Sequence, residues 1–173
     1  MKQKLKFIIL LFVVNFLFIS CASMMTHEIP SYSQDQEVNY REDIKFKIEK
    51  TYWTNQTSTQ TADANFLVVE MSITNIGKKS TATYPPVFTL ISDQGYEYEF
   101  SDRGTAGIDP NDNMLYKLKD SRLSPLVPVR GKVVFDVPKG NYFMIVSTGE
   151  KGEIIGRIYR GKDLFRIKLL PEN

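Results

Sequence analysis

Cysteine and histidine, the residues best suited to nucleophilic and metal chemistry, each occur once in this chain of 173 residues, as Cys21 and His27. A catalytic Cys–His pair needs a folded pocket, but both residues precede the first stretch of strand-like periodicity. A Ser–His–Asp arrangement would need a histidine within the later region, where there is none. The chain also lacks HExxH, CxxC and a phosphate-binding glycine loop. We therefore expect that the protein is not an enzyme and binds no cofactor or metal.

Acidic and amide side chains in one segment raise the alternative of a calcium-binding loop. In DPNDN, Asp109, Asn111 and Asn113 occupy positions 1, 3 and 5 of a calcium-binding loop. Met114 stands where that loop requires Gly, and Asp120 replaces the bidentate Glu. An Asx-rich turn has the same composition and is the structure that we expect here.

The position of Cys21 indicates another role for its thiol. The chain opens with three lysines and no acid, continues with the apolar run FIILLFVV (residues 7–14), and reaches Phe-Ile-Ser-Cys at residues 18–21. A basic start and a short apolar segment are typical of an export signal, and the run is shorter than the roughly 20 residues that span a bilayer. Ser20 followed by Cys21 resembles a bacterial lipobox, which implies a signal peptide over residues 1–20 and lipidation of Cys21.

Lipidation would anchor the protein to a membrane through Cys21. A single acyl chain binds a bilayer only marginally, whereas a lipoprotein cysteine carries two or three. Residues 21–41 are polar and lack steady periodicity, which predicts a flexible tether, and residues 42–173 form one domain. Neither Ala22 nor Ser23 is the Asp that retains lipoproteins at the inner membrane of diderm enterobacteria. We expect a bacterial cell-envelope location, at the outer membrane if the host is diderm.

Charge and cysteine content exclude a nucleic-acid-binding protein and a domain stabilised by an intrachain disulfide. The whole chain has 22 basic and 20 acidic residues, a net charge of +2. Removing residues 1–20 removes three lysines and no acid, which leaves 19 basic against 20 acidic groups, or −1. Such a balance excludes the strongly basic surface that nucleic-acid binding needs. The single cysteine excludes an intrachain disulfide, so a packed core has to stabilise the domain.

Apolar and polar residues alternate along most of the domain with the period of two that marks half-buried strands. The inward-facing sets are Ile44, Phe46 and Ile48; Leu67, Val69, Met71 and Ile73; and Tyr96, Tyr98 and Phe100. Turns separate the runs, including one at Gly77, for which we expect a positive φ, and one at residues 160–163. Residues 54–64 and 101–113 are expected to be loops, and residues 114–123 to hold a short helical turn. Seven or eight short strands without a long amphipathic helix predict an all-β, antiparallel, Ig-like β-sandwich.

Three segments resemble a family of secreted or lipid-anchored bacterial Ig-like domains of unknown function, the structural type of the mycobacterial immunoprotective extracellular antigen. FLVVEMSITNIGKK is similar to the family's long strand ending in Asn and Gly, here Asn75 and Gly77. FTLISDQGYEYEF is similar to its hairpin, with Asp93 and Gly95. GKVVFDVPKG (residues 131–140) is similar to its Gly-x-hydrophobic-Phe-acid-Val-Pro signature. The resemblance implies an Ig-like sandwich and brings no catalytic residues with it.

These expectations combine into a membrane-anchored lipoprotein whose non-catalytic domain binds a protein or another macromolecule of the envelope or the extracellular space. Its loops or an edge strand would form the binding surface. An alternative is a proteinase inhibitor in which loop 54–64 or 101–113 enters an active site. A third hypothesis is an envelope hydrolase that uses a pair of acidic side chains.

Overall fold

The computed structural model describes residues 29–172 except 83–84, 120–121 and 152–157. A first sheet contains, in spatial order, β1 (Ser31–Ser33), β11 (Ile158–Lys168), β10 (Tyr142–Lys151), β6 (Val87–Ser92) and β7 (Glu97–Glu99). A second contains β2 (Val38–Arg41), β3 (Ile44–Gln56), β4 (Thr61–Asn75) and β9 (Val129–Asp136). The remaining described elements are the strand pair β5 (Thr81–Ala82) and β8 (Arg122–Leu123) and the helices α2 (Asp102–Ala106) and α3 (Met114–Leu118).

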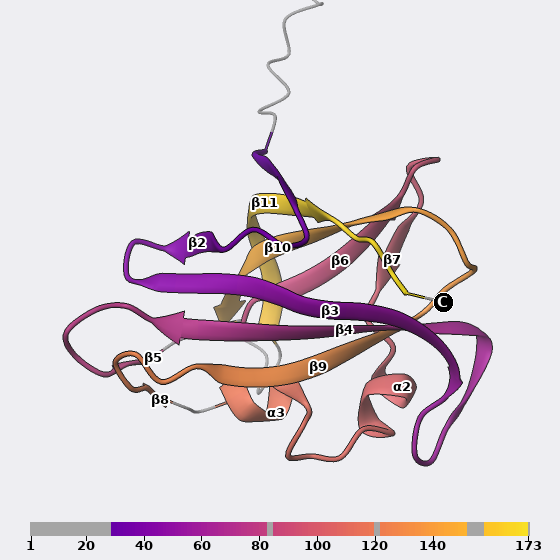
Figure 1. Ribbon diagram of the computed structural model, residues 1–173, viewed down its shortest axis with the longest axis horizontal. Coiled ribbons are helices and arrows are strands. Elements are labelled where there is room, and N and C mark those ends of the chain that lie inside the picture. Colours follow the sequence, from indigo (N-terminus) through magenta and orange to yellow (C-terminus); the bar gives the residue numbers. More distant parts are fainter. Residues whose placement is uncertain (1–28, 83–84, 120–121, 152–157, 173) are drawn as a thin grey trace, which may run out of the picture.

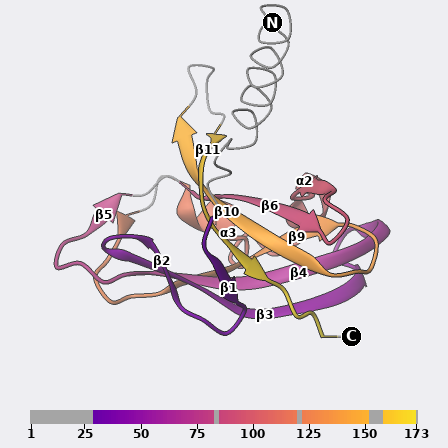
Figure 2. The same cartoon turned by 90° about the horizontal axis from the view of Figure 1, so that it is seen from above.

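The two larger sheets lie face to face as a β-sandwich, with α2 and α3 beside the second sheet (Figure 1). Figure 2 shows the same layers from above, with β1 lying along β11. The paired strands run antiparallel except β1, which is parallel to β11. Seven of the eleven described strands have four or more residues. The predicted all-β, Ig-like sandwich is therefore confirmed, with one parallel pair added at an edge.

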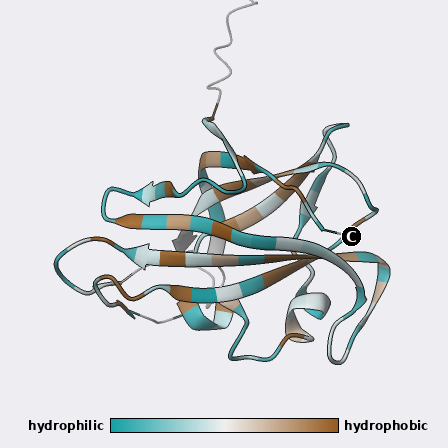
Figure 3. Ribbon diagram, viewed as in Figure 1, coloured by the Kyte–Doolittle hydropathy of each residue, from teal (hydrophilic) through white to brown (hydrophobic). Residues whose placement is uncertain are grey.

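Alternate residues of β3 and β4 form one side of the core, as predicted. Each of the following is at most 1% exposed: Ile44, Phe46, Ile48, Leu67, Val69, Met71 and Ile73. The first sheet contributes the opposing side chains Phe88, Leu90, Met144, Val146, Phe165 and Ile167. The colours of Figure 3 alternate between hydrophobic and hydrophilic along β3 and β4 accordingly. Because burying such a side chain contributes about 1.5–3 kcal/mol, this core can stabilise the domain without a disulfide.

Tyr142, at the start of β10, forms the tyrosine corner that is a feature of Ig-like folds. Its hydroxyl donates a hydrogen bond to the carbonyl oxygen of Pro138, 2.6 Å away. The ring packs against Trp53 and Tyr98, whose ring centroids lie 6.3 and 5.8 Å from its own. Tyr98 therefore packs on the core as predicted, whereas Tyr96, at the adjoining turn, is 61% exposed.

Helix α2 covers part of the outer face of the second sheet, where the sequence predicts only a loop. Phe66, Val68 and Val134 form a separate buried cluster on that face. Ser101 caps the helix, since its hydroxyl accepts a hydrogen bond from Gly104 N at 3.0 Å. A Cβ on Gly104 would lie 2.7 Å from Val134 Cγ1. Glycine at this position thus lets the helix approach the sheet.

The domain begins before residue 42, so the predicted tether of residues 21–41 is too long. Strands β1 and β2 lie inside that segment. Val38 and Tyr40 alternate into the core and are 4% and 3% exposed, and Arg166 N donates to Pro30 O at 2.9 Å. Two alternating apolar residues among many polar ones give only a weak periodic signal, which explains the wrong boundary.

Two predicted turns are mostly strand. β3 extends to Gln56 and β4 begins at Thr61, so residues 57–60 connect them instead of residues 54–64. The turn predicted at residues 160–163 lies inside β11, where the register against β10 shifts as it does at a β-bulge. A bulge uses the same glycine and polar residues as a turn, so composition alone does not separate the two.

Residue 77 is glycine because a side chain there would be too close to its neighbours. Its backbone does not have the positive φ that we predicted. A Cβ on Gly77 would lie 3.0 Å from Asn75 Oδ1 and 3.3 Å from the Cβ of Asp43. Among the described residues, positive φ occurs at Gly95, with 86°, and at Leu126, with 60°. Gly95 lies in the turn between β6 and β7, whereas Leu126 is a bulky residue in a conformation that favours glycine.

Candidate functional site

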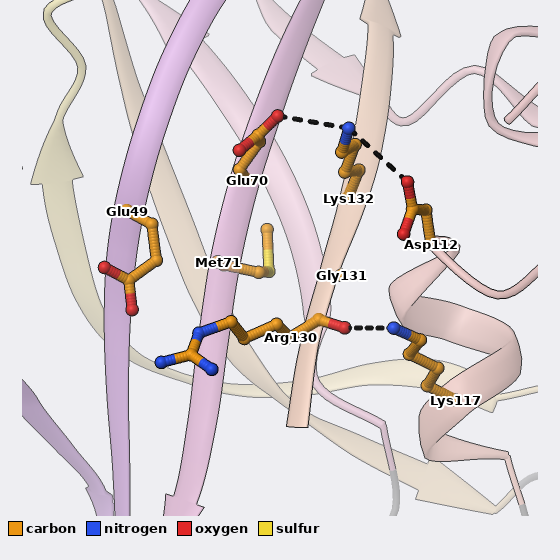
Figure 4. Close-up of a pocket in the computed structure, with 8 residues that line it drawn as sticks. All are labelled: Glu49, Glu70, Met71, Asp112, Lys117, Arg130, Gly131 and Lys132. Atoms are coloured by element: carbon orange, nitrogen blue, oxygen red, sulfur yellow. Dashed lines mark hydrogen bonds and ion pairs between the residues drawn. The ribbon is translucent and has the colours of Figure 1, made fainter. Parts of the chain in front are cut away.

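A groove of about 340 Å³ lies on the outer face of the second sheet, where β9 meets α3 (Figure 4). We call it the charged groove, and it is lined by Glu49, Glu70, Met71, Asp112, Lys117, Arg130, Gly131 and Lys132. Strands β3, β4 and β9 contribute most of these residues, and α3 and the segment before it contribute the others. Three of the eight are acids and three are bases, so the groove presents charges of both signs.

The groove exists because α3 and the segment before it rest directly on β9. A Cβ on Gly131 would lie 2.7 Å from Met114 Cα and 2.8 Å from Met114 N, so only glycine permits this approach. Lys132 N donates a hydrogen bond to Asp112 O at 2.7 Å. This contact covers the edge of β9 and holds Asp112 beside Lys132.

Lys132 joins two acids across the groove. Its Nζ lies 3.2 Å from Glu70 Oε1 and 3.5 Å from Asp112 Oδ2. Partial burial alone would lower the pKa of Lys132, but the hydrogen bond with Glu70 and the surrounding negative groups outweigh it and raise that pKa. Lys132 is therefore charged at neutral pH.

Glu49 is held in the opposite charge state. Its carboxylate accepts a hydrogen bond from Ser72 Oγ at 2.7 Å and lies 3.2 Å from Lys47 Nζ. The hydrogen bond from Ser72 is the largest cause that lowers the pKa of Glu49, with help from the charges of Lys47 and Arg130 and against partial burial. Glu49 is therefore ionised at neutral pH.

Arg130 carries the exposed guanidinium of the groove. It extends toward the side on which Glu49 lies (Figure 4), while its backbone oxygen accepts a hydrogen bond from Lys117 Nζ at 2.6 Å. No hydrogen bond or ion pair joins this guanidinium to another residue of the described chain. Because a guanidinium can bind a carboxylate or phosphate through two parallel hydrogen bonds, Arg130 is the lining residue best placed to contact a ligand.

The groove supplies fixed charges rather than groups poised for proton transfer. A general acid at neutral pH needs a carboxyl group of raised pKa. In the described part of the chain, the carboxyl pKa values that depart clearly from their ordinary range are those of Asp35, Glu49 and Asp163, and all three are lowered. No group of three His, Cys, Asp or Glu residues in these ranges could hold a metal ion. Nothing positive indicates catalysis here.

The residue predicted to carry lipid lies outside the described residues. Cys21 belongs to residues 1–28, as does His27, so lipidation of Cys21 stays a prediction. Within the ranges that the structure describes, no helix is long and apolar enough to cross a membrane.

The loop from Asp109 to Asn113 uses its side-chain oxygens to hold its own backbone. Asp109 Oδ1 accepts a hydrogen bond from Asn111 N at 2.8 Å, as in an Asx turn. Asn113 Oδ1 accepts from Leu115 N at 3.0 Å and from Tyr116 N at 3.3 Å at the start of α3. Two of the three oxygens that a calcium ion would use thus serve a turn and a helix cap, which favours the Asx-rich turn.

The two segments considered for proteinase inhibition brace each other. Ser58 Oγ donates a hydrogen bond to Gly107 O, and a Cβ on Gly107 would lie 2.1 Å from Thr57 Oγ1. Thr57 N also donates to Gln60 O at 2.8 Å, which closes the connection between β3 and β4. These contacts join the two segments to each other and leave the inhibitor hypothesis untested.

The signature segment at residues 131–140 has a packing role. The carboxylate of Asp136 accepts hydrogen bonds from Asp63 N at 2.8 Å and from Ala64 N at 2.9 Å. This acid therefore secures the start of β4 against the end of β9. Asp136 therefore has a structural role in the signature, whereas Gly131 and Lys132 at its start line the charged groove.

Sequence reasoning did not predict the charged groove. Glu70 pairs with Lys132 only because β4 and β9 adopt one particular register. The outward position of Glu70 in an alternating strand was the available signal, but it does not name a partner on another strand.

A family profile for a domain of unknown function, DUF4352, matches residues 35–152. Among solved structures, the secreted protein MPT63 from Mycobacterium tuberculosis is similar, with 13% identity and a TM-score of 0.53 over 82% of this chain and 99% of that chain. An uncharacterized β-sandwich protein from Clostridium difficile 630 has 11% identity and a TM-score of 0.50 over 83% and 95%. A conserved hypothetical protein from Bacillus anthracis has 12% identity and a TM-score of 0.50 over 77% and 94%.

At these identities the structural similarity shows the shared fold alone. No curated protein matches the chain. The resemblance to bacterial Ig-like domains of unknown function is confirmed by the profile and by the shared fold. Since the matched region covers most of the chain, the protein belongs to the DUF4352 family of domains of unknown function.

Proposed function

We propose that the protein is a lipid-anchored, non-catalytic binding module of the bacterial cell envelope. Its Ig-like domain would bind another envelope or extracellular macromolecule through the charged groove. The observation that carries the proposal is Lys132, which is held between Glu70 and Asp112 at 3.2 and 3.5 Å. This arrangement holds charges of both signs at an accessible surface, which suits a partner with complementary charges.

The N-terminal sequence supports the anchor. Cys21 follows a basic start and a short apolar run, and it has no partner cysteine anywhere in the chain. Two or three acyl chains on Cys21 would make membrane attachment stable, because each buried CH₂ contributes about 0.8 kcal/mol. MPT63, which shares the fold, is itself described as a secreted protein. Ala22 and Ser23 after the cysteine suit an outer-membrane address in a diderm host.

The charge pattern supports a macromolecular partner rather than a simple ion. The neighbouring strands β3 and β4 contribute the acids of the sheet and β9 contributes its bases, so a ligand of one sign would meet repulsion as well as attraction. A protein surface or peptide that carries both signs in the complementary order would avoid this conflict. Such complementarity raises association rates and excludes wrong partners.

The same observations argue against the hydrolase hypothesis and give the inhibitor hypothesis no support. The Ser72 hydrogen bond lowers the pKa of Glu49, so this acid is a poor proton donor at neutral pH. The loops proposed for inhibition are braced by the bond between Ser58 and Gly107. Assay of the protein against a panel of proteases tests the inhibitor directly, and inhibition at micromolar concentration would favour it over the groove.

A pair of charge reversals tests the role of the groove. Arg130→Glu reverses its exposed guanidinium, whereas Lys168→Glu reverses an exposed base on β11 of the other sheet. Both tagged variants are used to capture partners from solubilised envelopes, beside the unchanged protein. We expect a partner that is retained by Lys168→Glu and lost with Arg130→Glu. Equal capture by both variants would contradict the groove as the binding surface.

A further inference from the structure

A second surface, at the end of the sandwich near β5 and β8, displays apolar side chains to solvent. Ile76, Leu126 and Val127 are 40%, 73% and 56% exposed, and we call these three residues the apolar tip. Ile76 follows β4, and the other two lie between β8 and β9. Figure 3 shows hydrophobic colour in that connection, at the left end of the view. Exposed apolar residues that gather at one place, unlike scattered ones, indicate an interaction site.

Asn75 brings the two parts of the tip together. Its backbone oxygen accepts a hydrogen bond from Leu126 N at 2.8 Å. Its fully buried side chain donates to Lys79 O and Leu123 O, both at 2.8 Å, and accepts from Gly77 N at 2.8 Å. The tip is therefore fixed to the core by a satisfied polar network rather than hanging from a loose loop.

The backbone of Leu126 is strained, and its side chain faces water. A φ of 60° is unfavourable for a residue with a Cβ, and structures keep such strain mainly where surrounding contacts impose it. A buried leucine would compensate for the strain by packing, but this one is 73% exposed. The favourable contact that Leu126 lacks within the chain can come from a surface outside it.

Basic residues outnumber acidic ones around the tip by three to two. Lys78 and Lys79 are exposed in the turn after Ile76, and Arg122 donates to Ser80 O at 2.8 Å. The nearby acids are Glu42 and Asp43 of the turn between β2 and β3, and Asp43 O accepts from Ile76 N at 2.8 Å. Apolar side chains beside lysine and arginine are the combination that an anionic bilayer surface binds.

We propose that the apolar tip is a second membrane contact, which inserts Leu126 and Val127 among anionic lipids while Lys78 and Lys79 meet their headgroups. The proposal rests on the proposed lipid anchor at Cys21. The eight residues between Cys21 and Pro30 can reach at most about 30 Å, so the anchor keeps the domain close to the bilayer. At such an effective concentration a weak second contact becomes significant. The domain would then lie on the membrane in a defined orientation instead of moving freely on its tether.

A spin-label experiment on the full chain tests this contact. Because Cys21 is the only natural cysteine and would be acylated, Leu126→Cys provides one free thiol for a nitroxide. Leu170→Cys is the control, since Leu170 is 60% exposed and lies near the C-terminus, at the other end of the sandwich (Figure 1). Both proteins are bound to vesicles of phosphatidylcholine with or without phosphatidylglycerol. Flotation measures attachment, and accessibility of the label to oxygen and to a nickel chelate measures depth.

We expect the label at position 126 to shift toward high oxygen and low nickel accessibility on the anionic vesicles, while the label at position 170 stays aqueous. Adding Lys78→Glu and Lys79→Glu should return the label at position 126 to the aqueous values. An aqueous label at position 126 on protein that floats with the vesicles overturns the second contact and leaves the anchor intact. Protein that does not float overturns the anchor, and the second contact with it.

Discussion

Gly131 lies so close to Met114 that a Cβ on the glycine would come within 2.7 Å of the Met114 Cα atom. This approach lets α3 rest on β9 and forms one wall of the charged groove. The glycine of the family signature is therefore a packing requirement with a functional consequence, because the position of Asp112 beside Lys132 depends on it.

Gly131→Ala should destabilise the domain and disturb the groove. Overpacking of this kind costs about 1–3 kcal/mol, since the backbone of Met114 would have to shift. Urea unfolding measures the loss. Gly140→Ala is the matched control, because its Cβ would come no closer than 3.6 Å to the Tyr142 ring. Equal midpoints for Gly131→Ala and the unchanged protein would show that α3 adjusts freely.

The tyrosine corner gives a second test of stability. Tyr142→Phe removes the hydrogen bond to Pro138 O and should cost about 1 kcal/mol. Tyr40→Phe should leave the free energy of unfolding unchanged or raise it, because it removes a buried hydroxyl that has no hydrogen-bond partner of good geometry in the described chain. The Tyr40 hydroxyl is buried near Arg41 and Gly149 but makes no hydrogen bond of good geometry within the described chain. Thermal or urea unfolding of both variants compares them, and a larger loss for Tyr40→Phe would contradict this assignment.

The loss of folding stability at acidic pH should depend on Glu49. Its pKa is lowered below the ordinary value of 4.5 by the Ser72 hydrogen bond, with partial burial opposing. A lowered pKa contributes stability that is fully present above about pH 4.5 and is lost as the pH falls through the folded-state value. Glu49→Gln should therefore lower the urea midpoint at pH 7, and the difference from the unchanged protein should shrink below pH 4.5. A difference that grows on acidification would contradict this sign.

Ser72→Ala provides the companion measurement for that prediction. Removing the hydroxyl takes away the largest cause of the lowered pKa, so the acid loss of stability should move to higher pH. If the acid transition of Ser72→Ala is the same as that of the unchanged protein, the hydrogen bond does not control Glu49.

Much of the fold could be predicted from the sequence because alternation along a strand is a local property. Ile44, Phe46 and Ile48 are all buried as expected, and their spacing alone identifies the inward face. The boundaries were harder, because Val38 and Tyr40 become core residues only through pairing with a strand from elsewhere in the chain. Local pattern does not contain that information.

The candidate site could not be predicted in the same way. Glu70 and Lys132 are ordinary outward-facing charges in the sequence, and only the register of β4 and β9 makes them a pair. Asp112 joins them because a glycine on β9 admits the segment before α3. The apolar tip likewise depends on Asn75, whose backbone oxygen binds Leu126 N.

The most direct test of the proposed function is cross-linking in intact cells with the tagged full-length protein, followed by purification and mass spectrometry. The comparison includes Cys21→Ala, which would stay unlipidated, and Arg130→Glu, which alters the groove alone. We predict that one envelope protein is recovered reproducibly, is lost with Cys21→Ala and is strongly reduced with Arg130→Glu. If no protein is enriched although Cys21 carries lipid, the binding-module account is contradicted.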